Sequence, residues 1–259
     1  MKFVNRIQRY RHLLTKKDKD IVAFIEETEF TDDFSMINSL ASAIDTSPAT
    51  ITRFAHKLNY ENFQDMKFSL QQEKTVKPIE NSPLIQRIHN YHQNVIQQTG
   101  EFVSEKQIQR FVNQLKRSRQ IIYSGLGSSG LSATEFYYRT MRMGMKVHAS
   151  LLSKSDTFVA ISNSGETKEL IAAANIAKAR GAFVVAITNY EGSTLTQSAD
   201  LVLLTTDQKR INDPYFVNTQ IATSFLVDIV SYLLLEDDYL RGLYRQTTEV
   251  ILADKKGDV

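Results

Sequence analysis

The sequence contains no cysteine and no tryptophan, and only four of its 259 residues are proline. Without cysteine, disulfide bonds and thiolate metal sites are excluded. No apolar run approaches the roughly 18 residues that a membrane span needs, and the charged N-terminus lacks the apolar core of a secretory signal. We therefore expect a cytoplasmic protein with no membrane partner, no metal and no cofactor.

The length exceeds that of a typical single domain, which favours two domains. The net charge of +2 indicates no particular partner, but the charges are unevenly distributed. Residues 2–19 hold seven bases and one acid, whereas residues 20–33 hold six acids and no base. A basic end that faces DNA phosphates would explain this pattern, and so would a solvated surface of ion pairs.

The first 72 residues have helical spacing of their apolar positions, and the next eleven are polar, contain two prolines and show no periodicity. This pattern predicts an all-helical domain over 1–72, a linker over 73–83 and a second domain over 84–259. Within the first domain, capping residues predict helix starts at Thr15 with Asp18, at Ser35 and at Ser47 with Pro48.

Two of these helices, over 36–44 and 48–58, have the spacing of a helix-turn-helix. Small Ala41 falls where the two helices approach most closely, and Asp45 falls at the turn position that needs a positive φ, which aspartate tolerates. The inner face is predicted to consist of Leu40, Ile44, Ile51 and Phe54. The pattern indicates a DNA-binding unit.

The outward face of the second helix carries short polar groups and bases that can approach DNA. Arg53 is the best candidate for a base or phosphate contact because its forked donors match guanine or phosphate oxygens. A helical bundle used only for dimerisation is the alternative, since residues 1–72 hold ten bases and ten acids. The predicted DNA-facing residues are Ser47, Ala49, Thr50, Thr52, Arg53 and Lys57.

The run from Ile37 to Leu70, INSLASAIDTSPATITRFAHKLNYENFQDMKFSL, resembles the N-terminal domain of RpiR-type regulators. That family shares an Ala-rich helix, a Ser-x-Ala-Thr turn and an Arg-Phe pair. The resemblance covers roughly the first 72 residues. It implies that Ser47, Ala49, Thr50 and Arg53 face DNA.

From Leu84 onward helices alternate with strands, predicted at 120–124, 146–149, 157–161, 183–188 and 201–204. We read these strands as continuous apolar runs, which are typical of a parallel sheet covered by helices on both faces. The fold class is therefore α/β, with a doubly wound, five-stranded parallel sheet that follows the helical domain in the chain.

Two strand-to-helix turns carry the polar chemistry of this domain. The first contains Gly125, Gly127 and Gly130, a G-x-G-x-x-G match, but the next strand ends without the acid that a dinucleotide site requires. The second turn, over 162–167, is crowded with hydroxyl and amide side chains. Neighbouring parallel strands would bring both turns to one sheet edge, where free helix N-termini suit an anion.

The second domain is similar to the sugar isomerase (SIS) domain, through Gly-x-Gly-x-Ser followed about 35 residues later by Ser-x-Ser-Gly-x-Thr. The resemblance runs from about Leu84 to Ile251 and implies a flavodoxin-like sheet and a sugar-phosphate ligand. The implied binding residues are Ser128, Ser129, Ser162, Asn163, Ser164 and Thr167. The alternative for any one serine is a helix cap.

Two features depart from that family. Only the segment 150–156 joins the second and third predicted strands, too short for the usual crossover helix. Gln220 stands where such regulators usually have arginine. Both features affect the edge of the expected pocket.

We expect a DNA-binding regulator of sugar metabolism that acts on double-stranded operator DNA. A phosphorylated sugar, a hexose or aminosugar phosphate, would modulate it, and it would assemble as a homodimer or homotetramer. The alternative is a sugar-phosphate isomerase or aminosugar-processing enzyme with a helical assembly domain. Its acid and base would come from Glu135, Glu166, His148, His89 or His92, none of which lies in a recognisable catalytic motif. We therefore expect no enzymatic activity.

Overall fold

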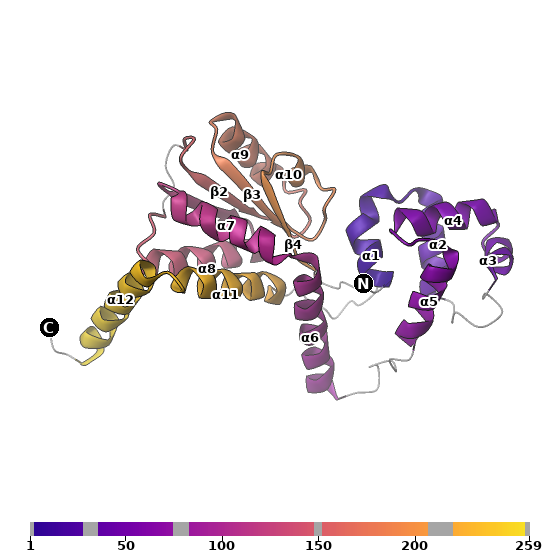
Figure 1. The fold of residues 1–259 in the computed structure, drawn as a ribbon, viewed down its shortest axis with the longest axis horizontal. Helices are drawn as coiled ribbons and strands as arrows, with labels where there is room; N and C mark the ends of the chain where they lie inside the picture. The colour runs from indigo at the N-terminus through magenta and orange to yellow at the C-terminus, as the bar shows by residue number, and fades with distance from the viewer. Residues whose placement is uncertain (1–2, 28–35, 75–82, 148–151, 207–219, 257–259) are drawn as a thin grey trace. The chain divides into compact units, whose positions relative to one another are not determined.

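A computed structural model describes residues 3–27, 36–74, 83–147, 152–206 and 220–256. The chain divides into two compact units, Met1–Ile88 and His89–Val259, each described by itself below (Figure 1). One helix, α6 (Leu84–Phe102), runs across this division. No helix in the described ranges is both long and apolar enough to cross a membrane.

The first unit is built of short helices whose starts follow the predicted caps. The Asp18 carboxylate accepts hydrogen bonds from the amide and the hydroxyl of Thr15, both at 2.7 Å, and the Ser47 hydroxyl accepts one from the Thr50 amide at 3.2 Å. Ser35 lies outside the described residues. The elements are α1 (Phe3–Tyr10), the 3₁₀ helix η1 (Arg11–Leu13), α2 (Lys16–Glu27), α3 (Ile37–Ala43), α4 (Pro48–Lys57) and α5 (Phe63–Lys74).

The core of this unit confirms the predicted inner face of α3 and α4. Leu40, Ile51 and Phe54 are fully buried, Ala41 is buried, and Ile44 is half-buried against the same cluster. Helix α5 continues to Lys74, two residues into the predicted linker, and residues 75–82 lie outside the described part of the chain.

The second unit is an α/β layer structure with a parallel sheet in the order β1-β2-β3-β4. Helices α7, α8 and α11 cover one face of the sheet, and α9 with α10 covers the other (Figure 1). Its further elements are α7 (Glu105–Arg117), β1 (Ile121–Gly125), α8 (Ser128–Arg142), β2 (Thr157–Ile161), α9 (Lys168–Ala179), β3 (Phe183–Thr188), α10 (Thr194–Gln197), β4 (Leu201–Leu204), α11 (Ile221–Leu235) and α12 (Asp238–Lys256).

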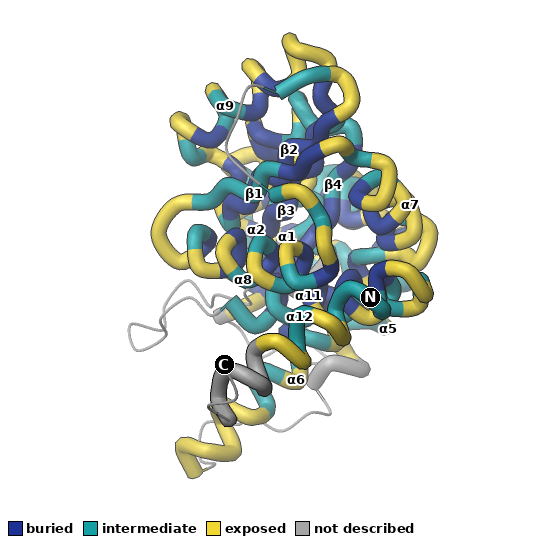
Figure 2. The backbone as a smooth tube through the Cα atoms, turned by 90° about the vertical axis from the view of Figure 1, so that its left-hand side faces the viewer, coloured by how far each residue is buried: buried dark blue, intermediate teal, exposed yellow. Residues whose placement is uncertain are grey.

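Alternate residues of the strands enter two different cores because successive side chains of a strand point to opposite faces. Val159 and Ile161 of β2 pack against α7, α8 and α11, whereas Phe158 and Ala160 pack against α9. Figure 2 shows β2 and β3 as the buried interior of this unit, while β1 is only half-buried over most of its length. The continuous apolar runs follow from burial on both faces.

The prediction of five strands is wrong for the described residues, which contain four. Of the predicted strand 146–149 the structure describes residues 146 and 147, and there Val147 pairs with the sheet through one parallel bridge to Ile121. This segment lies beyond the edge strand β1, and its Lys146 is exposed and Val147 only half-buried. A segment with one neighbour and little buried surface lacks the contacts that extend a ladder. Residues 148–151 lie outside the described ranges, so the structure describes 152–156 of the 150–156 connection.

Candidate functional site

The outward face of α4 presents the predicted DNA-facing groups beside the helix-turn-helix turn. Asp45 in that turn has a φ of 49°, as predicted. Ser47, Ala49 and Arg53 are exposed. Thr50, Thr52 and Lys57 are half-buried.

Most polar groups on this face bond within α4. The Ser47 and Thr50 hydroxyls lie 2.9 Å apart, and the Thr52 hydroxyl donates to the Pro48 carbonyl at 3.1 Å. The Arg53 guanidinium donates to the Ala49 carbonyl and to the Thr50 hydroxyl, each at 3.3 Å. These bonds hold Arg53 along its helix toward the N-terminus. Its charge and the positive end of the helix dipole therefore lie together, which favours an anion such as a phosphate.

Lys57 forms an ion pair within the first unit. Its Nζ lies 2.5 Å from the Asp18 carboxylate of α2, and the Asp18 side chain is only 4% exposed. Burial alone would raise the pKa of Asp18, but hydrogen bonds from Lys57 and Thr15 outweigh it and lower that pKa. Lys57 thus joins α4 to α2, a role that its place on the outward face did not predict.

Other bases of the N-terminal stretch also tie the helices together. Arg6 of α1 donates to the Leu58 carbonyl at 3.1 Å, and its guanidinium lies 4.0 Å from the centre of the Tyr60 ring. Lys17 of α2 donates to the Ile44 carbonyl at 3.0 Å, at the end of α3. Part of the basic excess of residues 2–19 therefore fixes the helix-turn-helix, while Lys16 and Lys19 are exposed.

The two polar turns of the second unit lie at the same edge of the sheet. β1 and β2 are parallel with Gly125 opposite Ile161, so the chain leaves both strands at the carboxyl edge. A Cβ on Gly125 would lie 2.5 Å from the Ser129 carbonyl oxygen, which explains why glycine ends β1. Gly127 has a φ of 57° and open space around it. The predicted juxtaposition is confirmed.

The second turn is held by its own hydroxyls and by a glycine. The buried Ser162 hydroxyl accepts a hydrogen bond from the Gly165 amide at 3.1 Å and lies 3.0 Å from the Thr167 hydroxyl. Gly165 has a φ of 67°, and a Cβ there would lie 2.1 Å from the Ser193 hydroxyl. No side chain fits at this position.

The six predicted ligand residues differ in exposure. Ser128 and Ser164 are exposed, Asn163 and Thr167 are half-buried, and Ser129 and Ser162 are buried. Gly127 and Thr167 precede α8 and α9 without a side-chain cap on either helix. Free amides and exposed hydroxyls at two adjacent helix N-termini can hold an anion through neutral donors.

A further polar layer at this edge was not predicted. Thr188 ends β3, Asn189 follows it and Thr205 follows β4; all three are buried, and the Thr205 hydroxyl donates to the Asn189 side-chain oxygen at 2.6 Å. The sequence contained a signal for this layer, because each of these polar residues comes at or just after the end of an apolar strand. Gln220, before α11, accepts a hydrogen bond from Ser132 of α8 at 2.9 Å.

The two carboxylates considered as catalytic acids or bases, Glu166 and Glu135, already form hydrogen bonds or an ion pair within the protein. Glu166 accepts hydrogen bonds from the Thr194 hydroxyl and amide at 2.7 and 2.8 Å, which lower its pKa. Glu135 pairs with Arg139 at 2.7 Å and accepts from Ser224 at 3.0 Å. His89 and His92 lie on α6, away from both turns in sequence, and His148 lies outside the described residues.

Comparisons with known proteins agree with both units. Residues 1–77 match the model of the helix-turn-helix domain of the rpiR family, and residues 114–232 match that of the SIS domain. An uncharacterised HTH-type transcriptional regulator of Haemophilus influenzae is 27% identical, with 97% of each chain covered.

Two solved structures share the fold. The Vibrio vulnificus NanR protein, solved in complex with ManNAc-6P, is 24% identical with a TM-score of 0.60, covering 96% of this chain and 97% of that one. The sugar isomerase domain of an RpiR transcription factor from Sphaerobacter thermophilus is 17% identical with a TM-score of 0.57, covering 64% of this chain and 98% of that one. With both family models matched in the order that the sequence predicted, the chain belongs to the RpiR-type transcriptional regulators, which join a helix-turn-helix domain to an SIS domain.

Proposed function

We propose that this regulator binds operator DNA through α4 and that a phosphorylated sugar at the carboxyl edge of the sheet modulates the binding. Residues 1–72 would form the DNA-binding domain and residues 84–259 the sensing domain, within the bacterial cytoplasm where the DNA lies. The proposal depends on one observation above all: β1 and β2 end side by side in turns that open two uncapped helices.

The chemistry of the edge favours a phosphate group on a neutral sugar. Ser128, Ser164 and Thr167 offer hydroxyls, and the α8 and α9 termini offer amides to an anion. Asn163 and the polar layer of Thr188, Asn189 and Thr205 add groups that can form hydrogen bonds with sugar hydroxyls. A few bonds to a charged group at about 1.5–3 kcal/mol each, reduced by the costs of binding, give roughly micromolar to millimolar affinity. That range suits a metabolite sensor.

Sensing without turnover fits the site better than isomerisation. An isomerase needs a free base and acid within reach of the sugar carbons. Glu135 and Glu166 are both engaged in ion pairs or hydrogen bonds. The matched relative from Haemophilus influenzae is likewise named a transcriptional regulator.

The expected mechanism is a shift between two arrangements of a dimer or tetramer. Two copies would present two α4 helices to successive half-sites of DNA. Binding of the sugar phosphate would favour one distance between these helices. The free energy by which the ligand shifts the equilibrium between the two arrangements cannot exceed the difference between its binding free energies for them.

A thermal-shift panel of hexose, aminosugar and pentose phosphates tests the ligand class. A ligand that binds the folded form raises the melting temperature, and the shift grows with the logarithm of the ligand concentration once that exceeds the dissociation constant. We expect stabilisation by one of these phosphates and none by the same sugar without phosphate. Equal stabilisation by the free sugar, or conversion of the sugar phosphate during incubation, would contradict the proposal.

A further inference from the structure

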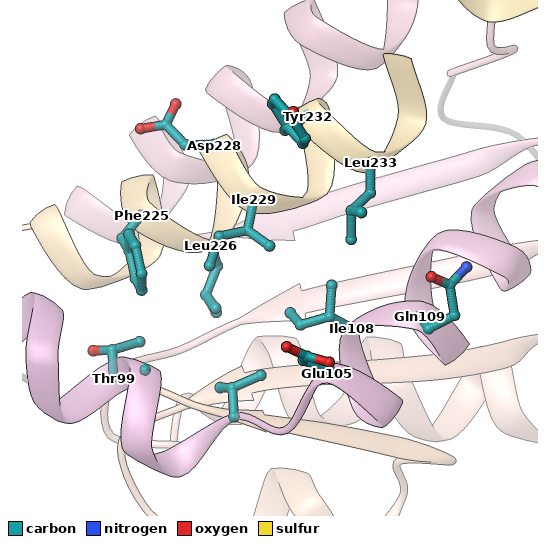
Figure 3. Close-up of a pocket in the computed structure, with 12 residues that line it drawn as sticks. Thr99, Glu105, Ile108, Gln109, Phe225, Leu226, Asp228, Ile229, Tyr232 and Leu233 are labelled. Atoms are coloured by element: carbon teal, nitrogen blue, oxygen red, sulfur yellow. The ribbon is translucent and has the colours of Figure 1, made fainter. Parts of the chain in front are cut away.

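A pocket of about 750 Å³ in the second unit does not suit a further contact with DNA. It lies between α7 and α11, and Figure 3 shows Ile229 and Leu233 of α11 pointing toward Ile108 of α7. Apolar side chains form most of its lining, and its charged residues, Glu105 and Asp228, would repel DNA phosphates. The unassigned group that can read a base lies on α4.

His56 lies at the centre of the outward face of α4. Successive residues of an α-helix are turned by about 100°, so His56 is nearly in line with Ala49 and is flanked by Thr52 and Arg53. The buried residues of α4 lie on the opposite side, and His56, Ala49 and Arg53 are exposed. These four positions have the spacing i, i+3, i+4 and i+7, with which the reading helix of a homeodomain contacts bases in the major groove. His56 therefore belongs to the set that can reach base edges.

The end of the helix orients the imidazole of His56. Its Nδ1 lies 3.2 Å from the Tyr60 carbonyl oxygen. A carbonyl only accepts, so Nδ1 carries the proton, and Nε2 of the neutral ring is an acceptor. The described part of the chain does not occupy Nε2. By contrast, Arg53 can only donate, and the Thr52 hydroxyl already donates to the Pro48 carbonyl.

We propose that His56 is a specificity-determining residue, whose Nε2 accepts a hydrogen bond from the exocyclic amino group of cytosine or adenine. The inference rests on the proposed binding of DNA through α4. In the major groove, cytosine and adenine present amino donors, whereas guanine and thymine present acceptors that would face Nε2 without a proton between them. The forked donors of Arg53 suit guanine instead.

The spacing of the two side chains predicts where the bases that they read lie. His56 and Arg53 are three residues apart, which is about 4.5 Å along the helix, and successive base pairs are about 3.4 Å apart. The base that His56 reads should therefore lie about one or two base pairs from the one that Arg53 reads.

Selection from a pool of randomised duplexes tests this contact on the full chain, at about pH 8, where histidine side chains are mostly neutral. We expect the native chain to enrich cytosine or adenine at one position. His56→Ala should lose this preference and keep the others, and His56→Arg, which can only donate, should move it to guanine. In anisotropy, guanine or thymine at that position should weaken the native chain about three- to tenfold and leave His56→Ala unchanged.

Two further proteins separate this contact from general DNA binding. Gln71→Ala, at an exposed position of α5, is the matched control and should keep every base preference of the native chain. An unchanged preference in His56→Ala would overturn the proposal, and so would an equal loss of affinity on all duplexes, which would assign His56 to the DNA backbone. A native chain that enriches no duplex would overturn the proposed DNA binding as well.

Discussion

The helix-turn-helix and the carboxyl edge of the sheet position their polar groups in different ways. On α4 the side chains hold one another, since Arg53 bonds to Thr50 and Thr50 lies against Ser47. At the sheet edge close backbone packing adds to the hydrogen bonds of the Ser162 hydroxyl, at Gly125 and Gly165, where no side chain fits. Substitution of Arg53 on α4 should therefore change DNA binding more than folding, whereas a side chain at either glycine should disrupt the unit itself.

The largest effect is expected from Gly165→Val. A β-branched residue would be strained at a φ of 67°, and its Cβ would collide with the buried Ser193. Strain and overpacking together should cost about 2–6 kcal/mol of the free energy of unfolding of the second unit. Denaturant unfolding followed by circular dichroism measures this loss. Gly127→Ala is the control for backbone strain without collision, because its φ is 57° but nothing lies within 4 Å, and it should cost about 1–3 kcal/mol, less than Gly165→Val.

Replacing Lys57 should destabilise the first unit. Lys57→Met removes the partner of the buried Asp18 carboxylate, which keeps only its bonds to Thr15. We expect a loss of about 1–3 kcal/mol in the free energy of unfolding. Lys16→Met, at an exposed position of α2, should change it little. A variant of native stability that has lost DNA affinity would instead identify Lys57 as a DNA contact.

Arg53→Ala should have the converse effect. The side chain is exposed, so the free energy of unfolding should stay within about 0.5 kcal/mol of native. Affinity for operator DNA should fall by about 1–3 kcal/mol, or roughly 5- to 150-fold, if Arg53 contacts a base. Fluorescence anisotropy with specific and scrambled duplexes distinguishes a base contact from a phosphate contact. An equal loss on both duplexes would assign Arg53 to the DNA backbone.

The lowered pKa of Asp18 predicts a smaller, pH-dependent effect. Because the folded state favours the ionised carboxylate, its contribution is full above the ordinary pKa of about 4 and is lost as the pH falls through the lowered value. Acid unfolding of the first unit should therefore be less steep in Asp18→Asn. Identical acid profiles for the two proteins would show that the pair contributes no linkage.

Local patterns predicted most of the fold, and long-range contacts account for what they missed. The caps at Thr15 and Ser47 and the φ of Asp45 depend on residues within one turn, and all three were predicted correctly. The bond from Lys57 to Asp18 joins residues 39 apart, so no helical pattern could place it. The segment at Val147 was mistaken for a full strand because two apolar residues there do not reveal an exposed edge.

The sequence predicted where the two turns at the sheet edge lie, but not how far each of their side chains is buried. Both turns follow apolar strands, and parallel pairing brings them together. Which serines stay accessible depends on the packing of α8 and on contacts such as Gly165 with Ser193. Such contacts join segments far apart in the chain, and a local motif does not contain them.

The most direct test is the response of operator binding to the sugar phosphate that gives the largest thermal shift, measured by anisotropy for the native chain and Ser164→Ala. Ser164 is exposed, so the variant should fold and bind DNA as the native chain does. Losing a bond to a charged group should weaken the sugar phosphate by about tenfold and shift the response to that higher concentration. An unchanged response in Ser164→Ala would contradict the coupling of the sheet edge to DNA binding.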